Sequence, residues 1–127
     1  MAKEKIKWLD KPEDHNYPAA KSYLTLIFDE KEAIDLADIF RYLEKISYFK
    51  AKDIFRASKL SLLGVSNSHV EKNLKKIDDG KGLSPILLVR DIKNRTLIIA
   101  DGYHRMCGVY HHDEDALIPC KIISHNG

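Results

Sequence analysis

The chain has 127 residues, 44% of them hydrophobic and 31% charged, and its formal net charge is +2. This length and composition predict one globular domain, residues 1–127. The low net charge gives no support to a wholly basic nucleic-acid-binding protein, whose domain pI is usually above about 9. Apolar runs such as residues 86–89 are far shorter than the roughly 18 residues that a membrane span needs, so we expect no membrane attachment.

The N-terminal residues and the cysteines bear on cellular location. Residues 1–5 carry charge, but the apolar segment of a secretion signal does not follow them. Cys107 and Cys120 lie apart in the sequence and form no C-x-x-C pair, and reduced thiols are typical of the cytoplasm. We therefore expect a cytoplasmic protein.

The first half of the chain predicts two helices. Between residues 18 and 28, apolar residues recur at the i, i+3, i+4, i+7, i+8 spacing that places them on one helix face. They are Ala20, Tyr23, Leu24, Ile27 and Phe28. Asp29 precedes Glu32 by three residues, which is a capping-box pattern for a second helix. The expected buried residues of that helix are Ala33, Ala37, Phe40 and Leu43.

The second half begins with a helix and continues with strands. Ser68 and Glu71 form another capping box, for a short amphipathic helix that Gly80 can end. Residues 86–89 and 97–100 are apolar runs rich in β-branched side chains, and a short polar turn joins them. This pattern predicts an antiparallel hairpin that is buried on both faces.

The remaining segments complete the predicted architecture. Gly102 opens a helix that runs to His112, and residues 119–123 give a third strand. We expect an α+β domain with a small mixed or antiparallel sheet and helices. In this interpretation residues 1–50 form an N-terminal helical hairpin packed on a core of residues 51–127.

The best candidate for a working site is the strand-to-helix junction at residues 101–105. Backbone N–H groups and the positive end of the helix dipole favour a bound anion at a helix start. Gly102 has no Cβ and lets a phosphate approach closely, Arg105 would pair with its oxygens, and His104 would add a donor or a general base. The alternative is a purely structural turn, with Asp101 as an N-cap and Arg105 as a solvated charge.

The second half also resembles the ParB/sulfiredoxin-like superfamily, over about residues 54–123. In ParB N-terminal domains a G-x-Q-P step leads into a strand and a G-E-R-R turn leads into a helix; in sulfiredoxins the second turn is G-C-H-R. Here residues 82–85 are Gly-Leu-Ser-Pro and residues 102–105 are Gly-Tyr-His-Arg, in the same order. Tyr103 replaces the reactive cysteine of sulfiredoxins, so repair of cysteine sulfinic acid is not expected.

Members of that superfamily bind ATP or CTP with the phosphates at the glycine-to-helix turn. The resemblance therefore implies a nucleotide-binding domain, with Mg²⁺ accompanying the triphosphate. The implied site consists of Gly82, Ser84 and Pro85 on one wall and Asp101, Gly102, Tyr103, His104 and Arg105 on the other. His104 is the candidate catalytic residue for a weak nucleotidase or phosphotransferase, with Glu71, Asp101 or Asp113 as the acid–base or metal group. Whether chemistry follows binding is left open by the sequence.

A possible metal cluster has a simpler explanation. His104, Cys107 and His111 share one face of the predicted helix and, with Cys120, would match a Cys₂His₂ zinc site. A small cysteine in the core and a solvated histidine at the helix end account for the same residues. The cluster at residues 111–115, His-His-Asp-Glu-Asp, is interpreted in the same way, as a solvated helix end, with magnesium ligands near a bound triphosphate as the alternative. No metal site is predicted.

Two other functions stay open. One is a non-catalytic module in which the N-terminal helices capture a partner protein. The other is a ParB-like nuclease, and its modest basic track for nucleic acid would consist of Lys72, Lys75, Lys76 and Lys81. Residues 52–58 stand where the superfamily has its entering strand, which makes Arg56 a further, weaker site residue.

Overall fold

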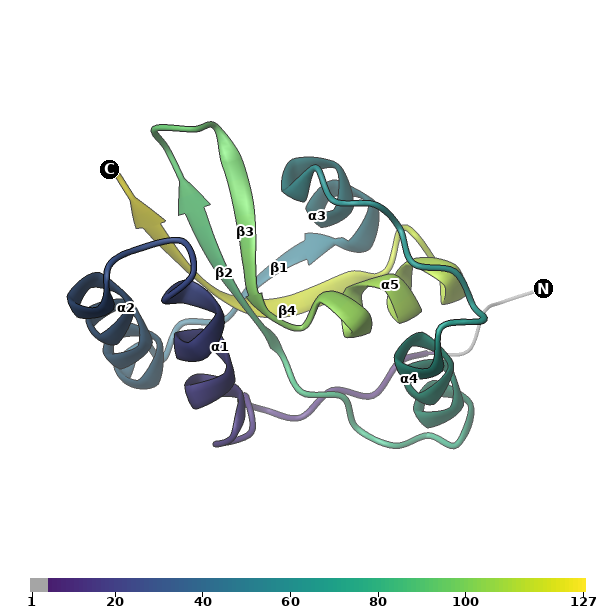
Figure 1. The fold of residues 1–127 in the computed structure, drawn as a ribbon. Helices are drawn as coiled ribbons and strands as arrows, with labels where there is room; N and C mark the ends of the chain where they lie inside the picture. Colours follow the sequence, from purple (N-terminus) through teal and green to yellow (C-terminus); the bar gives the residue numbers. More distant parts are fainter. Residues whose placement is uncertain (1–4) are drawn as a thin grey trace.

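The computed structural model describes residues 5–127 and places a mixed four-stranded sheet between two layers of helices (Figure 1). Strands β2 (Ile86–Asp91) and β3 (Thr96–Asp101) form the predicted antiparallel hairpin, and β4 (Leu117–His125) runs parallel to β2. Strand β1 (Ser47–Lys50) pairs antiparallel with β4, so the strand order is β1-β4-β2-β3. The combination of this sheet with the helices on its two faces confirms the predicted α+β class.

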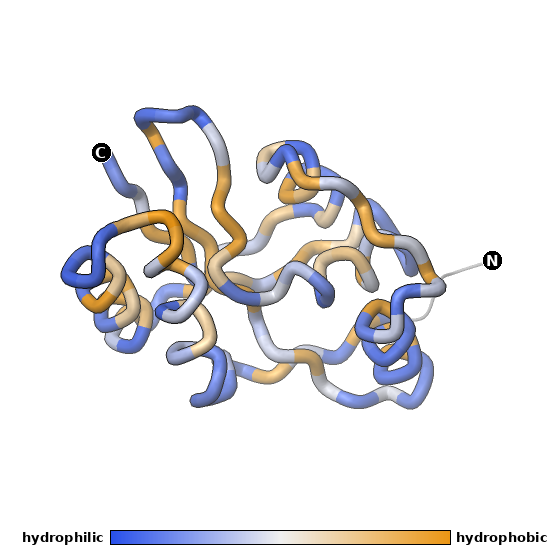
Figure 2. The backbone as a smooth tube through the Cα atoms, viewed as in Figure 1, coloured by the Kyte–Doolittle hydropathy of each residue, from blue (hydrophilic) through white to orange (hydrophobic). Residues whose placement is uncertain are grey.

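Alternation along β2 divides the core between the two faces of the sheet. Ile86 and Leu88 are fully buried in the cluster on one face, whereas Leu87 and Val89 are fully buried in the cluster on the other. Figure 2 shows apolar residues along the strands and polar ones at the tip of the β2–β3 hairpin. Over residues 86–89 the central strand therefore has no solvent-facing side, as its continuous apolar run predicts, and Arg90 beyond this run is exposed.

One face of the sheet is covered by α1 (Asn16–Leu24) and α2 (Glu30–Tyr42), the predicted helical hairpin (Figure 1). Asp29 caps α2 as expected, because its carboxylate accepts a hydrogen bond from the Glu32 backbone N–H at 2.8 Å. The sheet takes an edge strand, β1, from the first 50 residues as well, so this part of the chain is not helical throughout.

The expected packing of α1 is partly wrong. The helix ends at Leu24, and Tyr23 and Ile27 are 41% and 44% exposed. Its start is fixed from outside the helix, because the Asn16 side chain donates to Ser84 Oγ at 3.1 Å. The face towards the sheet carries Tyr17, Ala20 and Leu24, so two of the predicted residues pack as expected.

A buried lysine joins this helical layer to the sheet. Lys121 on β4 is 5% exposed, and its ammonium group donates to Tyr17 Oη and to the Phe40 carbonyl, each at 2.9 Å. The Phe40 carbonyl belongs to the last turn of α2, which lacks partners within the helix. Lys121 therefore anchors both helices and interacts favourably with the negative end of the α2 dipole.

The other face of the sheet is covered by α3 (Ala51–Ser58), α4 (Ser68–Asp78) and α5 (Tyr103–His112). The last two confirm the predicted helices. The cap of α4 is Asn67, whose side chain accepts from the N–H groups of two residues in the first turn, so the expected cap at Ser68 is wrong by one residue.

The expectation of a strand at residues 52–58 is also wrong. These residues belong to α3, because Ala51, Ile54 and Ser58 recur at helical spacing and bury against the sheet. Arg56 lies on the exposed side of α3 and lines none of the cavities described below. Within residues 5–127, no helix combines the length and the apolar character that crossing a bilayer requires.

Candidate functional site

A polar cavity of about 270 Å³ lies where the start of α5 meets α4 and the segment before α1. It brings together most of the predicted site. The predicted residues that line it are Ser84, Asp101, Gly102, Tyr103, His104 and Arg105. The fold thus places the step before β2 opposite the turn after β3, as the resemblance implied.

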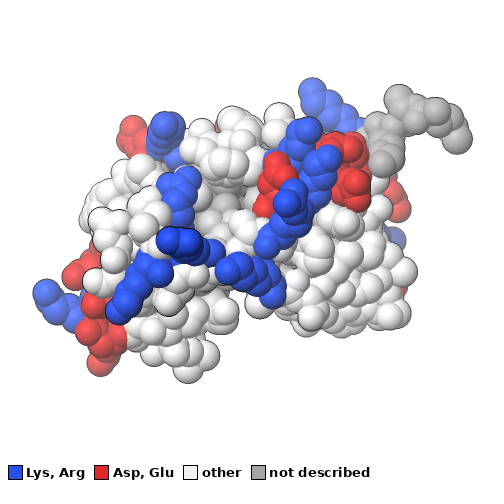
Figure 3. Space-filling view, turned by 90° about the horizontal axis from the view of Figure 1, so that it is seen from above, with Lys and Arg blue, Asp and Glu red and all other residues white. Residues whose placement is uncertain are grey.

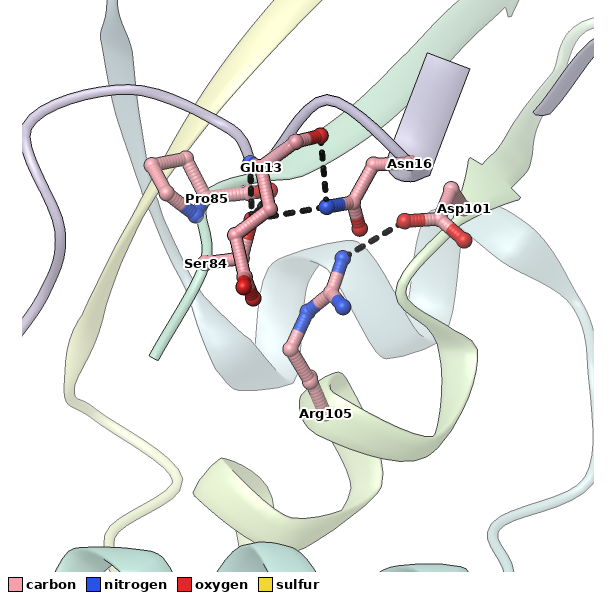
Figure 4. A network of polar contacts seen from close by, with 6 residues as sticks. All are labelled: Glu13, Asn16, Ser84, Pro85, Asp101 and Arg105. Atoms are coloured by element: carbon pink, nitrogen blue, oxygen red, sulfur yellow. Dashed lines mark hydrogen bonds and ion pairs between the residues drawn. The ribbon is translucent and has the colours of Figure 1, made fainter. Parts of the chain in front are cut away.

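Two predicted residues do not line the cavity. Gly82 packs instead against the N-terminal arm, where an added Cβ would lie 2.9 Å from Leu9 Cδ2. Pro85 is buried beside Ser84 at the entry to β2 (Figure 4). Both shape the wall from behind and are not exposed to a ligand in the cavity.

Gly102 is required by its surroundings. Its φ is +112°, and an added Cβ would lie 2.3 Å from Ile86 Cγ2. Gly102 is also the N-cap of α5, and no side chain within the described residues caps this helix. The first N–H groups of α5 therefore lack both intrahelical partners and a side-chain acceptor, and the residues that carry them line the cavity.

Arg105 is the central cation of the site. Its Nη2 donates to Asp101 Oδ2 at 2.7 Å, and the two side chains are 17% and 19% exposed (Figure 4). Its Nε is buried and has no hydrogen-bond acceptor within the described chain. The guanidinium group therefore has donor capacity that the ion pair with Asp101 does not use.

Ser84 has a different role from the predicted one. Its hydroxyl accepts from the Glu13 backbone N–H at 3.0 Å and from Asn16 Nδ2 at 3.1 Å (Figure 4). Asn16 Nδ2 also donates to the Glu13 carbonyl at 2.9 Å. Ser84 thus holds the segment before α1 against the cavity, and its oxygen is occupied by that contact.

His104 and His69 both line the cavity, and their rings are in contact. Their ring centroids are 4.7 Å apart. Burial, and secondarily the charge of His69, hold the pKa of His104 below its ordinary value of about 6.5. His104 is therefore a neutral imidazole near pH 7 and can accept a proton, which suits a general base and not a permanent cation.

Tyr103 contributes its ring and not its hydroxyl. The hydroxyl donates to the Ser61 carbonyl, and burial raises the pKa of the phenol. The hydrogen bond fixes the ring between the loop before α4 and the edge of the cavity.

The prediction missed the wall that α4 contributes. That wall consists of His69, Lys72, Asn73 and Lys76, and Glu13 and His15 complete the lining from the segment before α1. The α4 residues recur at the i, i+3, i+4, i+7 spacing, so a polar stripe on one helix face was detectable in the sequence. Lys75 lies off this stripe, and its ammonium group is 3.9 Å from Asp79.

The charge of the cavity is positive. Lys72, Lys76 and Arg105 oppose the carboxylates of Glu13 and Asp101, so the fixed charges sum to +1 before any histidine is protonated. The partial positive charge of the α5 start adds to this balance. An anionic ligand would neutralise this excess positive charge.

The residues of the hypothetical zinc cluster are engaged separately. His111 Nε2 donates to the Leu63 carbonyl at 2.7 Å, and Cys120 donates to the Ser47 carbonyl at 3.3 Å. Burial raises the pKa of both cysteines, that of Cys120 to about 12. Among residues 5–127, no group of three or more histidine, cysteine or acidic side chains is arranged to hold a metal ion.

Comparison of the chain with protein-family models, with curated protein sequences and with solved structures finds no match.

Proposed function

We propose that this domain binds a phosphorylated ligand, most simply a nucleotide, with the phosphates in the cavity at the start of α5. The observation that carries the proposal is the convergence of the uncapped α5 start, the partly unsatisfied Arg105 and the two lysines of α4 on one cavity. Phosphate recognition uses these groups together: backbone N–H groups, a planar guanidinium fork and mobile ammonium groups.

The size of the cavity suits only part of a nucleotide. At about 270 Å³ it lies just below the range of roughly 300–1,000 Å³ that is usual for small-molecule pockets. It suits a chain of phosphates, with the remainder of the ligand at the mouth. The proposal of ATP or CTP comes from the resemblance to the ParB/sulfiredoxin-like superfamily, since nothing in the cavity itself selects a base.

Asp101 has a double part in this proposal. In the free protein it pairs with Arg105, and a bound phosphate would compete with it for the guanidinium group. With Mg²⁺ present, Asp101 and Glu13 are the carboxylates in the cavity lining that could share the metal with phosphate oxygens. Asp113 cannot take this part, because it follows the last turn of α5, about 15 Å from the first at 1.5 Å rise per residue.

Slow phosphoryl chemistry is the extension of this proposal. His104 lines the cavity in its neutral form and could take a proton from an attacking water or hydroxyl. Phosphoryl transfer depends mostly on positioning and charge neutralisation, for which Arg105 and the lysines suffice.

Thermal unfolding with ATP, CTP and ADP, each with and without Mg²⁺, tests the proposal. A ligand at 100 times its Kd adds about 2.7 kcal/mol of stability, or roughly 10 °C in Tm for a domain of this size. We expect Arg105→Gln to abolish the shift and Arg56→Gln, which removes an exposed arginine of α3, to keep it. Absence of a shift with every nucleotide would contradict nucleotide binding.

A further inference from the structure

A second surface, remote from the phosphate cavity, has the composition of a docking groove. Two adjoining hollows of about 180 and 440 Å³ lie between α3 and the β2–β3 hairpin, and both are lined by Ala57, Arg90 and Leu97. We call them together the hairpin groove. It shares no lining residue with the phosphate cavity.

The floor of the hairpin groove is apolar. It is formed by Phe49, Ile54, Leu88, Leu97 and Ile122. Phe49, Leu97 and Ile122 are only partly buried, although they belong to the sheet face that the helices cover elsewhere. The short helix α3 therefore leaves part of this face open beside the hairpin. Ile92, which is 46% exposed, extends the apolar surface towards the hairpin turn.

The rim of the hairpin groove is cationic. Lys59, Arg90 and Arg95 line it, and none of them forms an ion pair within the described chain. Arg90 is held in place by a hydrogen bond from its Nη1 to Ser124 Oγ at 2.8 Å. Figure 3 shows Lys and Arg side chains in a band across this face, over the hairpin and α3 at the top of Figure 1, with Asp and Glu side chains beside the right-hand part of the band.

The acidic residues of the groove offset only part of this rim. Lys59, Arg90 and Arg95 oppose Asp53 and Asp91, so the fixed charges of the lining sum to +1. The Asp91 carboxylate accepts two hydrogen bonds from Asn94, which hold its pKa below the ordinary value and keep it ionised. The groove therefore has a net positive charge.

We propose that the hairpin groove binds an acidic peptide segment of a partner protein, with large apolar side chains on the floor and carboxylates at Lys59, Arg90 and Arg95. Charge complementarity selects an acidic partner, and the aliphatic floor selects a peptide over a nucleic acid. Single-stranded nucleic acid uses aromatic rings on which its bases stack, and Phe49, partly buried, is the one aromatic residue in the described lining. An apolar groove with a charged rim is a common mode of peptide recognition.

The backbone at the rim offers variants that remove charge without endangering the fold. Lys59 and Arg95 have φ of +58° and +53°, a conformation that glycine adopts at less cost. The double variant Lys59→Gly/Arg95→Gly should therefore fold at least as stably as the wild type. Lys31→Gln/Lys45→Gln is the matched control, since it removes two exposed cations from the region of α2.

Selection from a random peptide display library against the full chain, followed by anisotropy titration of the enriched peptides, tests the proposal. We expect enriched peptides to carry net negative charge with spaced large apolar residues. Their affinity should fall about tenfold in Lys59→Gly/Arg95→Gly and stay within twofold in the lysine control and in Arg105→Gln. The last variant separates this groove from the phosphate cavity.

A single-stranded oligonucleotide, dT16, serves as the competing probe. Tighter binding of dT16 than of any enriched peptide, with loss in the glycine variant, would overturn the proposal in favour of nucleic acid. Neutral or basic enriched peptides, no enrichment at all, or enrichment that the glycine variant retains would overturn it as well.

Discussion

Both ends of α5 carry polar and charged side chains. They differ in how many of their hydrogen-bonding groups find partners within the chain. At the start, the first turn has no side-chain cap within the described residues and Arg105 Nε lacks an acceptor. At the end, His111 donates to the Leu63 carbonyl at 2.7 Å, and Asp115 lies 2.6 Å from the Lys52 ammonium group. A polar cluster points to a ligand only where the fold leaves its donors unsatisfied, and α5 meets that condition at one end.

The largest effect is expected from Gly102→Ala, which disturbs the backbone conformation at the start of α5. The φ of +112° and the 2.3 Å approach to Ile86 Cγ2 both oppose a Cβ at this position. We expect the free energy of unfolding in urea to fall by about 3 kcal/mol. Gly64→Ala, whose Cβ would meet no atom within 4 Å, should change it by less than about 0.5 kcal/mol. A loss of stability in Gly102→Ala as small as that in Gly64→Ala would show that the turn tolerates a side chain.

A smaller effect is expected from the cationic stripe of α4. Lys72→Gln/Lys76→Gln removes both lysines that line the cavity, and the affinity for inorganic triphosphate should fall about tenfold, equivalent to roughly 1.4 kcal/mol. Lys75→Gln/Lys81→Gln removes the same charge outside the cavity lining and should cost less than about threefold. Equal losses of affinity in the two double variants at 150 mM salt would mean that net charge, and not the cavity, governs binding.

The smallest effect concerns pH. In the folded chain the pKa of His104 lies below its ordinary value of about 6.5. As pH falls, the imidazole is therefore protonated in the unfolded chain before it is protonated in the folded chain. The contribution of His104 to stability is fully present above about pH 6.5 and is lost as pH falls from there through the lower folded pKa. Urea unfolding between pH 5 and 7.5 should therefore show a weaker pH dependence in His104→Gln than in the wild type. An NMR titration that places the pKa of His104 at or above 6.5 in the free protein would refute this account.

A bound phosphate would raise the pKa of His104 from its value in the free protein. Its negative charge favours the imidazolium form, so ligand affinity should rise as pH falls towards the free-protein pKa of His104.

Periodicity was sufficient for the elements with local patterns. The β2–β3 hairpin and α5 lie where their apolar runs and Gly102 predicted them, and the turn after β3 does face the step before β2. Strand β1 escaped prediction because it has four residues and is defined by its pairing with β4, more than 60 residues away. The parallel pairing of β4 with β2 likewise has no local pattern.

Side-chain roles were less accessible to prediction than the elements. Asn16 at the start of α1 donates to Ser84, 68 residues away, and no local pattern predicts this contact, which occupies the Ser84 hydroxyl oxygen. The placement of Glu13 at the cavity depends on the same distant hydroxyl. The α4 stripe was accessible to prediction although it was missed, because the spacing of His69, Lys72 and Lys76 alone marks one helix face.

The central claim is that an anion binds at Arg105, and calorimetric titration of inorganic triphosphate into paired variants tests it most directly. Asp101→Asn removes the carboxylate that competes for the guanidinium group, and Arg105→Gln removes the guanidinium group itself. We expect affinity to rise severalfold in the first variant and to fall at least tenfold in the second, with both folded by circular dichroism. Equal weakening in the two variants, or no change in either, would show that the ion pair is structural and that the start of α5 is not an anion site.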